Sequence, residues 1–141
     1  MDLTNKVALV TGGGTGIGRA TCLALAQRGA VVAVNYSRSK ADADETMQMI
    51  KNEGGRAIAI QANVSQDREV RAMIDKIVQQ FGAVDLLVNN VLLVELKTVK
   101  ALDDAHRAQC TNYLKATGLQ LCLLLNFGKP RLEIKRVAHG L

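Results

Sequence analysis

The chain has 141 residues, of which 48% are hydrophobic and 22% charged, and its formal net charge is +5. A chain of this length and apolar content can bury one domain-sized core. Its longest apolar runs, such as residues 119–125, are too short to span a bilayer, and its first residues lack a secretory pattern, so we expect a cytoplasmic protein without a membrane segment. Three cysteines without paired spacing, Cys22, Cys110 and Cys122, indicate reduced packing residues rather than a disulfide framework.

A glycine-rich turn lies between a strand and a helix near the N-terminus. Residues 6–10 (KVALV) are an apolar run that predicts a buried strand, and residues 11–18 (TGGGTGIG) lead directly into a helical pattern. Gly12 can take the backbone angles of a tight turn, Gly16 lets the main chain approach a pyrophosphate, and Gly18 lets the helix pack close to the sheet. In this setting the turn predicts a nucleotide site at a helix N-terminus, although an ordinary flexible turn is the alternative.

Strands and helices alternate through the next seventy residues. The expected strands are residues 30–36, 56–61 and 84–88, and the expected helices are residues 41–53 and 67–81. Strands separated by helices of this length imply right-handed crossovers and a parallel sheet covered on both faces. The first half of the chain therefore predicts a Rossmann-like, doubly wound α/β fold.

Residues 1–90 resemble the short-chain dehydrogenase/reductase family, in particular its 3-oxoacyl carrier-protein reductase branch. The motifs that carry this resemblance are TGxxxGxG in residues 11–18, NYSR in residues 35–38, Asn63 and Val64 where the family usually has Asp-Val, and LVNN in residues 87–90. The resemblance implies an NAD(P) site, with Asn63 and Val64 near the adenine and Asn90 near the nicotinamide ribose. The implied cofactor-binding residues are Gly12, Gly14, Thr15, Gly16, Ile17, Gly18, Ser37, Arg38, Asn63, Val64 and Asn90.

The loop after the second expected strand bears on the choice of cofactor. An NAD site places a carboxylate about twenty residues past the glycines to accept the ribose 2′-hydroxyl, whereas an NADP site needs positive charge there. Residues 36–40 (YSRSK) contain no acid and two cations, which favours NADP(H) over NAD(H), although a solvated loop would have a similar composition.

A catalytic pair of the reductase type is not expected. Tyr36 and Lys40 have the YxxxK spacing of the family's catalytic residues but lie too early in the chain, and Tyr113 is followed at that spacing by Thr117. In the family that Tyr–Lys pair lies beyond the end of this chain. We therefore expect the NADP(H)-binding portion of a short-chain dehydrogenase/reductase-type oxidoreductase, truncated and without turnover, and we leave open whether the chain is an enzyme.

Residues 84–141 resemble a second family, the C-terminal part of the GxxExxY group of PD-(D/E)XK nuclease-like proteins. The matching stretches are VDLLVNNVLLVELKTV in residues 84–99, DDAHRAQCTNYLKATG in residues 103–118 and LCLLLNFGKPRLEIKRV in residues 121–137. The two resemblances overlap at residues 84–90, which suggests a chimeric chain of natural, recombinant or artefactual origin. A nuclease-like module with an incomplete metal site, or a non-functional fusion, is therefore the alternative function.

Such a nuclease would need carboxylates to hold Mg²⁺ or Mn²⁺ and a lysine to activate water. Asp85 and Glu95 are the candidate metal ligands, and Lys97 and Gln109 complete the candidate catalytic set. A two-residue turn would pair Asp85 with Val94, whereas a three-residue turn over residues 89–91 would pair it with Glu95. We predict the second register; an ordinary surface Glu–Lys pair is the alternative.

The second half predicts strands over residues 91–99, 120–126 and 132–138 and a helix over residues 103–117. The hairpin makes the sheet mixed, with its first four strands parallel. We expect one fused domain over residues 1–141, with a Rossmann portion in residues 1–90 and a GxxExxY-like portion in residues 91–141. The net charge is +1 in the first portion and +4 in the second, so the basic residues 129–136 are candidates for nucleic acid contact or for protecting an edge strand. The oligomeric state is left open.

Overall fold

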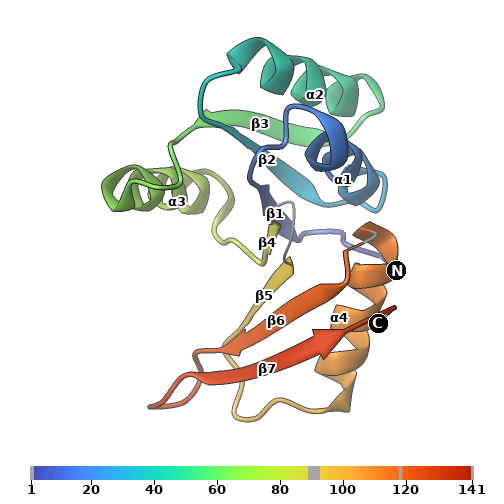
Figure 1. Cartoon of the computed structure of the whole chain (residues 1–141), viewed down its shortest axis with the longest axis vertical. Helices are drawn as coiled ribbons and strands as arrows, with labels where there is room; N and C mark the ends of the chain where they lie inside the picture. Colours follow the sequence, from blue (N-terminus) through green and yellow to red (C-terminus); the bar gives the residue numbers. More distant parts are fainter. Residues whose placement is uncertain (1, 89–92, 118, 141) are drawn as a thin grey trace.

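One mixed sheet organises the computed structural model, which describes residues 2–88, 93–117 and 119–140 (Figure 1). Its strands are β1 (Val7–Val10), β2 (Val31–Tyr36), β3 (Arg56–Gln61), β4 (Leu86–Val88), β5 (Leu93–Lys97), β6 (Leu121–Asn126) and β7 (Glu133–Ala138). The helices are α1 (Gly16–Ala26), α2 (Lys40–Asn52), α3 (Asp67–Phe81) and α4 (Asp104–Thr117). Across the described residues the strand order is β3-β2-β1-β4-β5-β6-β7.

The direction of the strands changes once the chain passes β4. Strand β1 is parallel to β2 and β4, and β2 is parallel to β3, because each connection carries a helix that crosses back over the sheet. Strand β5 is antiparallel to β4, β6 is parallel to β5, and β7 is antiparallel to β6. The predicted mixed sheet with four parallel strands is confirmed.

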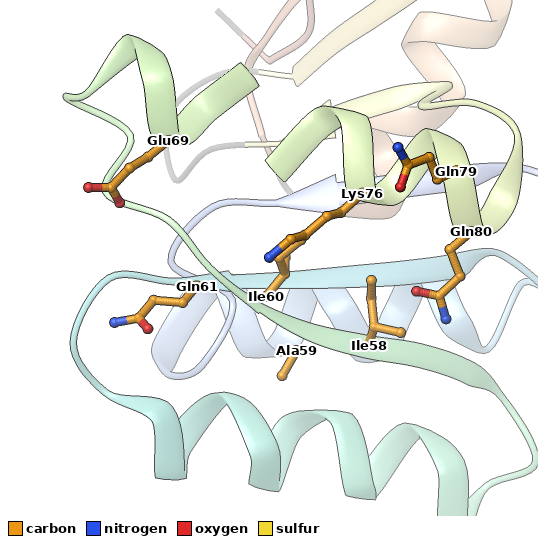
Figure 2. Close-up of a pocket in the computed structure, with 8 residues that line it drawn as sticks. All are labelled: Ile58, Ala59, Ile60, Gln61, Glu69, Lys76, Gln79 and Gln80. Carbon is orange, nitrogen blue, oxygen red and sulfur yellow. The ribbon is translucent and has the colours of Figure 1, made fainter. Parts of the chain in front are cut away.

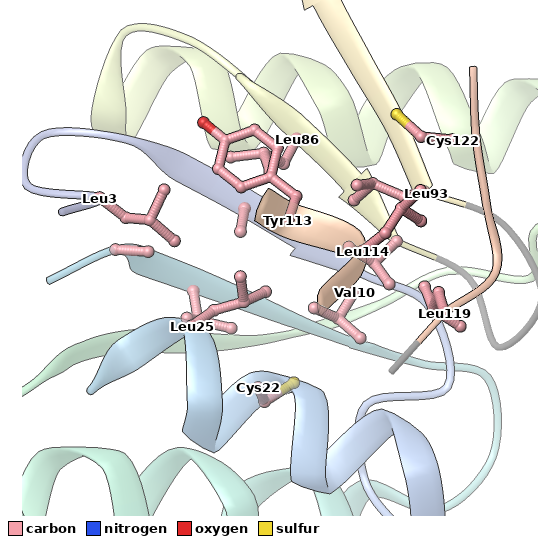
Figure 3. Close-up of a cluster of buried hydrophobic side chains, with 14 of the residues drawn as sticks. Leu3, Val10, Cys22, Leu25, Leu86, Leu93, Tyr113, Leu114, Leu119 and Cys122 are labelled. Atoms are coloured by element: carbon pink, nitrogen blue, oxygen red, sulfur yellow. The ribbon is translucent and has the colours of Figure 1, made fainter. Parts of the chain in front are cut away.

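The helices form two unequal layers. Figure 1 shows α1, α2 and α4 on one face of the sheet and α3 on the other. A buried cluster lies beneath α1, α2 and α4. It contains side chains from both sides of residue 90 (Figure 3). It includes Leu3, Val10, Cys22, Leu25, Leu86, Leu93, Tyr113, Leu114 and Cys122. A smaller cluster lies beneath α3 and contains Met73 and Ile77. The core is thus continuous from the first four strands into the second half of the chain.

The predicted register of the β4–β5 hairpin is wrong. The structure pairs Leu86 with Glu95 and Val88 with Leu93, so Glu95 lies opposite Leu86 rather than opposite Asp85. This register leaves residues 89–92 between the paired ends, one more than the predicted turn, and these residues lie outside those described. In this register the Asp85 side chain bonds to the start of β1. Its Oδ2 accepts from the Val7 backbone N–H at 2.8 Å, and its Oδ1 lies 3.3 Å from Lys6 Nζ.

None of the described helices combines the length and the apolar character needed to cross a membrane.

Candidate functional site

The glycine-rich turn between β1 and α1 depends on a left-handed glycine and on one close backbone approach. Gly12 has a φ of +63°, in the left-handed region that favours glycine, as predicted. A Cβ on Gly18 would lie 2.2 Å from the Gly12 carbonyl oxygen, so the first turn of α1 rests directly on the loop. The closest backbone contact of Gly18 is therefore with the turn itself, whereas the sequence had suggested a contact with the sheet.

The turn lies at the carboxyl ends of three parallel strands. Thr11 N–H donates to the Val88 carbonyl at 2.8 Å, and Gly13 N–H donates to the Asn35 carbonyl at 3.1 Å, so the loop is tied to the ends of β4 and β2. In the sheet, β2 and β3 lie on one side of β1 and β4 lies on the other, so the strand order reverses at β1. Ligands of open α/β sheets bind in the crevice at such a switch point.

A hollow of about 570 Å³ opens at this edge of the sheet. Its volume falls within the range of about 300–1,000 Å³ that is typical of ligand sites. Three segments line it: the glycine turn, the stretch from the end of β2 to the first turn of α2, and the loop after β3. The lining residues are Gly12, Gly14, Thr15, Asn35, Tyr36, Ser37, Arg38, Ser39, Asp42, Asn63 and Ser65.

Six of the eleven expected cofactor residues line this hollow, namely Gly12, Gly14, Thr15, Ser37, Arg38 and Asn63. Gly16, Ile17, Gly18 and Val64 do not line it, and the side chains of Ile17 and Val64 are exposed to solvent. Asn90 lies outside the described residues. The structure therefore brings together the glycine turn and the loop after β2, as the sequence predicted. The expected contact of Asn90 with the nicotinamide ribose stays a prediction.

The loop after β2 leaves one cation free. The Arg38 side chain is exposed and makes no hydrogen bond or ion pair with any described residue, while Lys40 forms an ion pair with Asp44 one helical turn later. Asp42, in the first turn of α2, also lines the hollow and was missed by sequence reasoning. Its place could have been expected from helical spacing, because a helix beginning near Lys40 brings its first-turn side chains back beside the loop.

Two asparagines shape the walls. Asn35 is buried, and its Nδ2 donates to the carbonyls of Ile60 at 3.3 Å and Ala62 at 3.1 Å, which ties the end of β2 to the end of β3. The Oδ1 of Asn63 accepts from the backbone N–H of Ser65 at 3.1 Å and from its hydroxyl at 2.8 Å. These bonds fix the loop after β3 against the hollow.

A second polar cluster lies on β5 and α4. Lys97 Nζ lies 2.8 Å from Glu95 Oε1 and donates to Gln109 Oε1 at 2.7 Å, so three of the four candidate nuclease residues meet. Glu95 is 2% exposed, its Oε2 has no hydrogen-bond partner, and burial raises the pKa of its carboxyl against the opposing effect of Lys97. Asp85, the fourth, is bonded to β1, and no group of three or more His, Cys, Asp or Glu side chains among the described residues could hold a metal ion.

Figure 2 shows a larger hollow, of about 710 Å³, between the outer strand β3 and helix α3. Ile58, Ala59, Ile60 and Gln61 line it from the strand, and Glu69, Lys76, Gln79 and Gln80 line it from the helix. None of these residues belongs to the glycine turn or to the loop after β2. This hollow therefore has neither of the features from which the sequence predicts a nucleotide site.

Comparison with known proteins shows similarity to short chain dehydrogenases over most of the chain. A family model described as short chain dehydrogenase matches residues 6–122. A short-chain dehydrogenase/reductase homolog of Bacillus subtilis is 60% identical over 90 residues, which are 64% of this chain and 83% of that protein. A 3-oxoacyl-[acyl-carrier-protein] reductase of Staphylococcus epidermidis is 54% identical over 86 residues, which are 61% of this chain and 35% of the reductase. The structure of a Burkholderia cenocepacia short chain dehydrogenase in complex with NADP is 30% identical, with a TM-score of 0.59, over 84% of this chain and 51% of that one.

The chain thus spans most of the Bacillus homolog but about a third to a half of the other two relatives. The family match extends to residue 122, well into the stretch for which a nuclease-like resemblance was expected, and no comparison supports that second resemblance. With the glycine turn, the switch-point hollow and this match on residues 6–122, the chain belongs to the short-chain dehydrogenase family.

Proposed function

We propose that this chain binds NADP(H) in the hollow at the carboxyl ends of β1 and β2, as the dinucleotide-binding portion of a short-chain dehydrogenase/reductase-type oxidoreductase. The observation that carries the proposal is the hollow itself, in which the glycine turn and the loop with Arg38 face one space of about 570 Å³. Backbone N–H groups at a helix N-terminus suit the pyrophosphate, and a free guanidinium suits the ribose 2′-phosphate.

Each wall of the hollow would take one part of the dinucleotide. The turn, with Gly12, Gly14 and Thr15 in the lining and Gly16 to Gly18 behind it, would hold the pyrophosphate. Ser37 and Arg38 would bind the 2′-phosphate, and Asn63 with Val64 would flank the adenine. Asn90 would approach the nicotinamide ribose from the stretch outside the described residues. When bound, the nicotinamide supplies hydride-transfer chemistry.

Asp42 is the one feature of the described lining that would favour NAD(H) over NADP(H). A carboxylate in this region can accept a hydrogen bond from the 2′-hydroxyl of NAD(H) and repels a 2′-phosphate. Arg38 lies at the exposed loop with no ion-pair partner among the described residues, whereas Asp42 lies in the helix that follows, so we propose that NADP(H) is preferred. Turnover is not part of the proposal, because Tyr36 and Lys40 form the only YxxxK spacing in the sequence, Tyr36 lines the cofactor hollow and Lys40 pairs with Asp44.

We also propose that residues 1–141 form one fused domain in the reducing cytoplasm. The buried cluster shared by Leu86, Leu93 and Leu114 supports a single folding unit, since separating the halves would expose it. Three buried, unpaired cysteines agree with a reducing compartment.

A second candidate function is binding of Mg²⁺ or Mn²⁺ at Glu95, favoured by its buried Oε2 atom without a hydrogen-bond partner. It ranks below the first because Asp85 is engaged with β1 and Lys97 already neutralises Glu95. Contact with nucleic acid is proposed only under this candidate. A Glu95→Gln variant that abolished a Mn²⁺-dependent rise in melting temperature would support it, and a melting temperature unaffected by Mn²⁺ would exclude it.

Calorimetric titration of the purified chain with NADP⁺ and NAD⁺ in parallel tests the first candidate, with far-UV circular dichroism to verify folding. We expect saturable binding that is tighter for NADP⁺. Equal affinity for both would remove the role of Arg38, and a folded chain that binds neither would refute the proposed function.

A further inference from the structure

The carbonyl group of Gly14, inside the glycine turn, is held from outside the turn. Arg19 Nε donates to the Gly14 oxygen at 2.8 Å, and Thr46 Oγ1 lies 3.1 Å from the same oxygen. Thr46 comes from α2, 32 residues further along the chain, and is fully buried. Its single hydroxyl proton can be donated either to Gly14 or to the Asp42 carbonyl, 3.0 Å away, while its oxygen accepts from Arg19 Nε at 3.0 Å.

Arg19 extends this contact to the first turns of α2. Its Nη2 donates to the Asp42 carbonyl at 3.3 Å and lies 2.7 Å from Glu45 Oε2. The packing is also close, because a Cβ on Gly14 would lie 3.1 Å from the backbone nitrogen of Ala43. Helix α2 follows the loop that carries Arg38, so the turn and this loop share one anchor at Gly14.

Fixing the Gly14 carbonyl also fixes the next N–H group. A trans peptide is planar, so the N–H of Thr15 points opposite to the Gly14 carbonyl, away from Arg19 and Thr46. Thr15 lines the hollow, and its backbone N–H donates to no described residue. An N–H oriented in advance binds an anion without the cost of ordering it at the moment of binding.

We propose that Arg19 and Thr46 are positioning residues, which lock the peptide between Gly14 and Thr15 so that the Thr15 N–H is presented to a phosphate of the dinucleotide. This inference rests on the proposed function and deepens it, since it assigns the orientation of the pyrophosphate turn to two residues outside the hollow. Thr46 is the sharper probe, because replacing it with valine removes the hydroxyl without changing size or charge.

The test compares NADP⁺ with adenosine 2′-monophosphate, which carries the 2′-phosphate but no pyrophosphate. In Thr46→Val we expect the dissociation constant for NADP⁺ to rise about 3- to 10-fold, the range given by loss of one neutral hydrogen bond. The dissociation constant for adenosine 2′-monophosphate should stay within about twofold, because its phosphate is read by the Arg38 loop. Thr46→Ser, which keeps the hydroxyl, should restore NADP⁺ binding.

Arg19→Met is the second variant and should weaken NADP⁺ more than Thr46→Val does, because it removes the 2.8 Å donor to Gly14. Calorimetry supplies the NADP⁺ constants, NMR titration supplies the weaker nucleotide, and circular dichroism verifies folding. Unchanged NADP⁺ binding in a folded Thr46→Val, proportional loss of both nucleotides, or failure of serine to rescue would overturn the inference. A wild-type chain that binds neither nucleotide would instead refute the proposed function, on which the inference depends.

Discussion

Replacing Arg38 with methionine should convert a preference for NADP⁺ into near-equal affinity for NADP⁺ and NAD⁺. Arg38 is the exposed cation of the hollow and has no ion-pair partner among the described residues, so its charge is available to a ligand. Methionine keeps much of the length of the side chain and removes only the charge and the donors. The substitution therefore isolates the interaction with the 2′-phosphate.

The size of the effect follows from the exposure of the site. Two unit charges about 4 Å apart attract each other by about 1 kcal/mol in water, and a hydrogen bond to a charged group contributes about 1.5–3 kcal/mol. Because Arg38 is exposed, we take the lower part of this range, about 1–2 kcal/mol. The dissociation constant for NADP⁺ should therefore rise about 5- to 30-fold, while that for NAD⁺ changes little.

Lys40→Met is the matched control. It removes one positive charge from the same loop, but Lys40 is paired with Asp44, so its loss should change NADP⁺ affinity by less than about twofold. Parallel calorimetric titrations of wild type and both variants, repeated at two salt concentrations, measure the difference. Equal losses in the two variants would mean that only the general charge of the loop matters, and the assignment of Arg38 to the 2′-phosphate would be refuted.

Three further predictions concern the fold. Gly18→Ala, whose Cβ would lie 2.2 Å from the Gly12 oxygen, should lower the unfolding free energy by about 2 kcal/mol or more and abolish dinucleotide binding. Gly16→Ala has open space around its Cβ but a left-handed φ of +53°, so it should lower the unfolding free energy by about 1–2 kcal/mol. Urea denaturation measures both. The raised pKa of Glu95 adds stability that is present below the ordinary value of 4.5 and is lost as pH rises through the raised one. The stability of wild type relative to Glu95→Gln should therefore fall as pH rises above 4.5, and a constant difference from pH 4 to 8 would contradict this. Leu93→Ala should cost about 2–5 kcal/mol in one cooperative transition, whereas two separate transitions in thermal melts followed by circular dichroism would argue against the shared core.

The glycine turn and the parallel strands could be predicted because their signals are local. Gly12, Gly16 and Gly18 lie within seven residues of one another, and glycine adopts the left-handed φ seen at Gly12 without the steric cost of a Cβ. The strands before and after the turn are short apolar runs, and the bounds of β3 and α3 agree with the prediction to the residue. Local chemistry thus sufficed to place the glycine-turn side of the hollow.

The hairpin register and the anchors of the turn could not be predicted, because they depend on distant partners. Asp85 bonds to the start of β1, 78 residues earlier, and no pattern near Asp85 indicates this. In the sequence, nothing distinguishes Thr46 from an ordinary helical threonine, because its contact with Gly14 exists only once α2 packs against the turn. The nuclease-like resemblance did indicate that Glu95, Lys97 and Gln109 meet, but this contact alone assigns no function.

The reversal at β5 limits what chemistry this chain can offer a bound dinucleotide. Only residues 89–92 separate β4 from β5, too few for the crossover that a parallel strand requires, so β5 runs back from the cofactor edge. Lys97, at the end of β5, and Asn126, at the end of the parallel strand β6, consequently lie at the edge opposite the glycine turn. Side chains at the carboxyl ends of β5 and β6 therefore lie too far from Val88 to reach a nicotinamide beside it. The carboxyl ends of β5 and β6 therefore add no proton donor to the edge that holds the glycine turn, and this agrees with the proposal of dinucleotide binding without turnover.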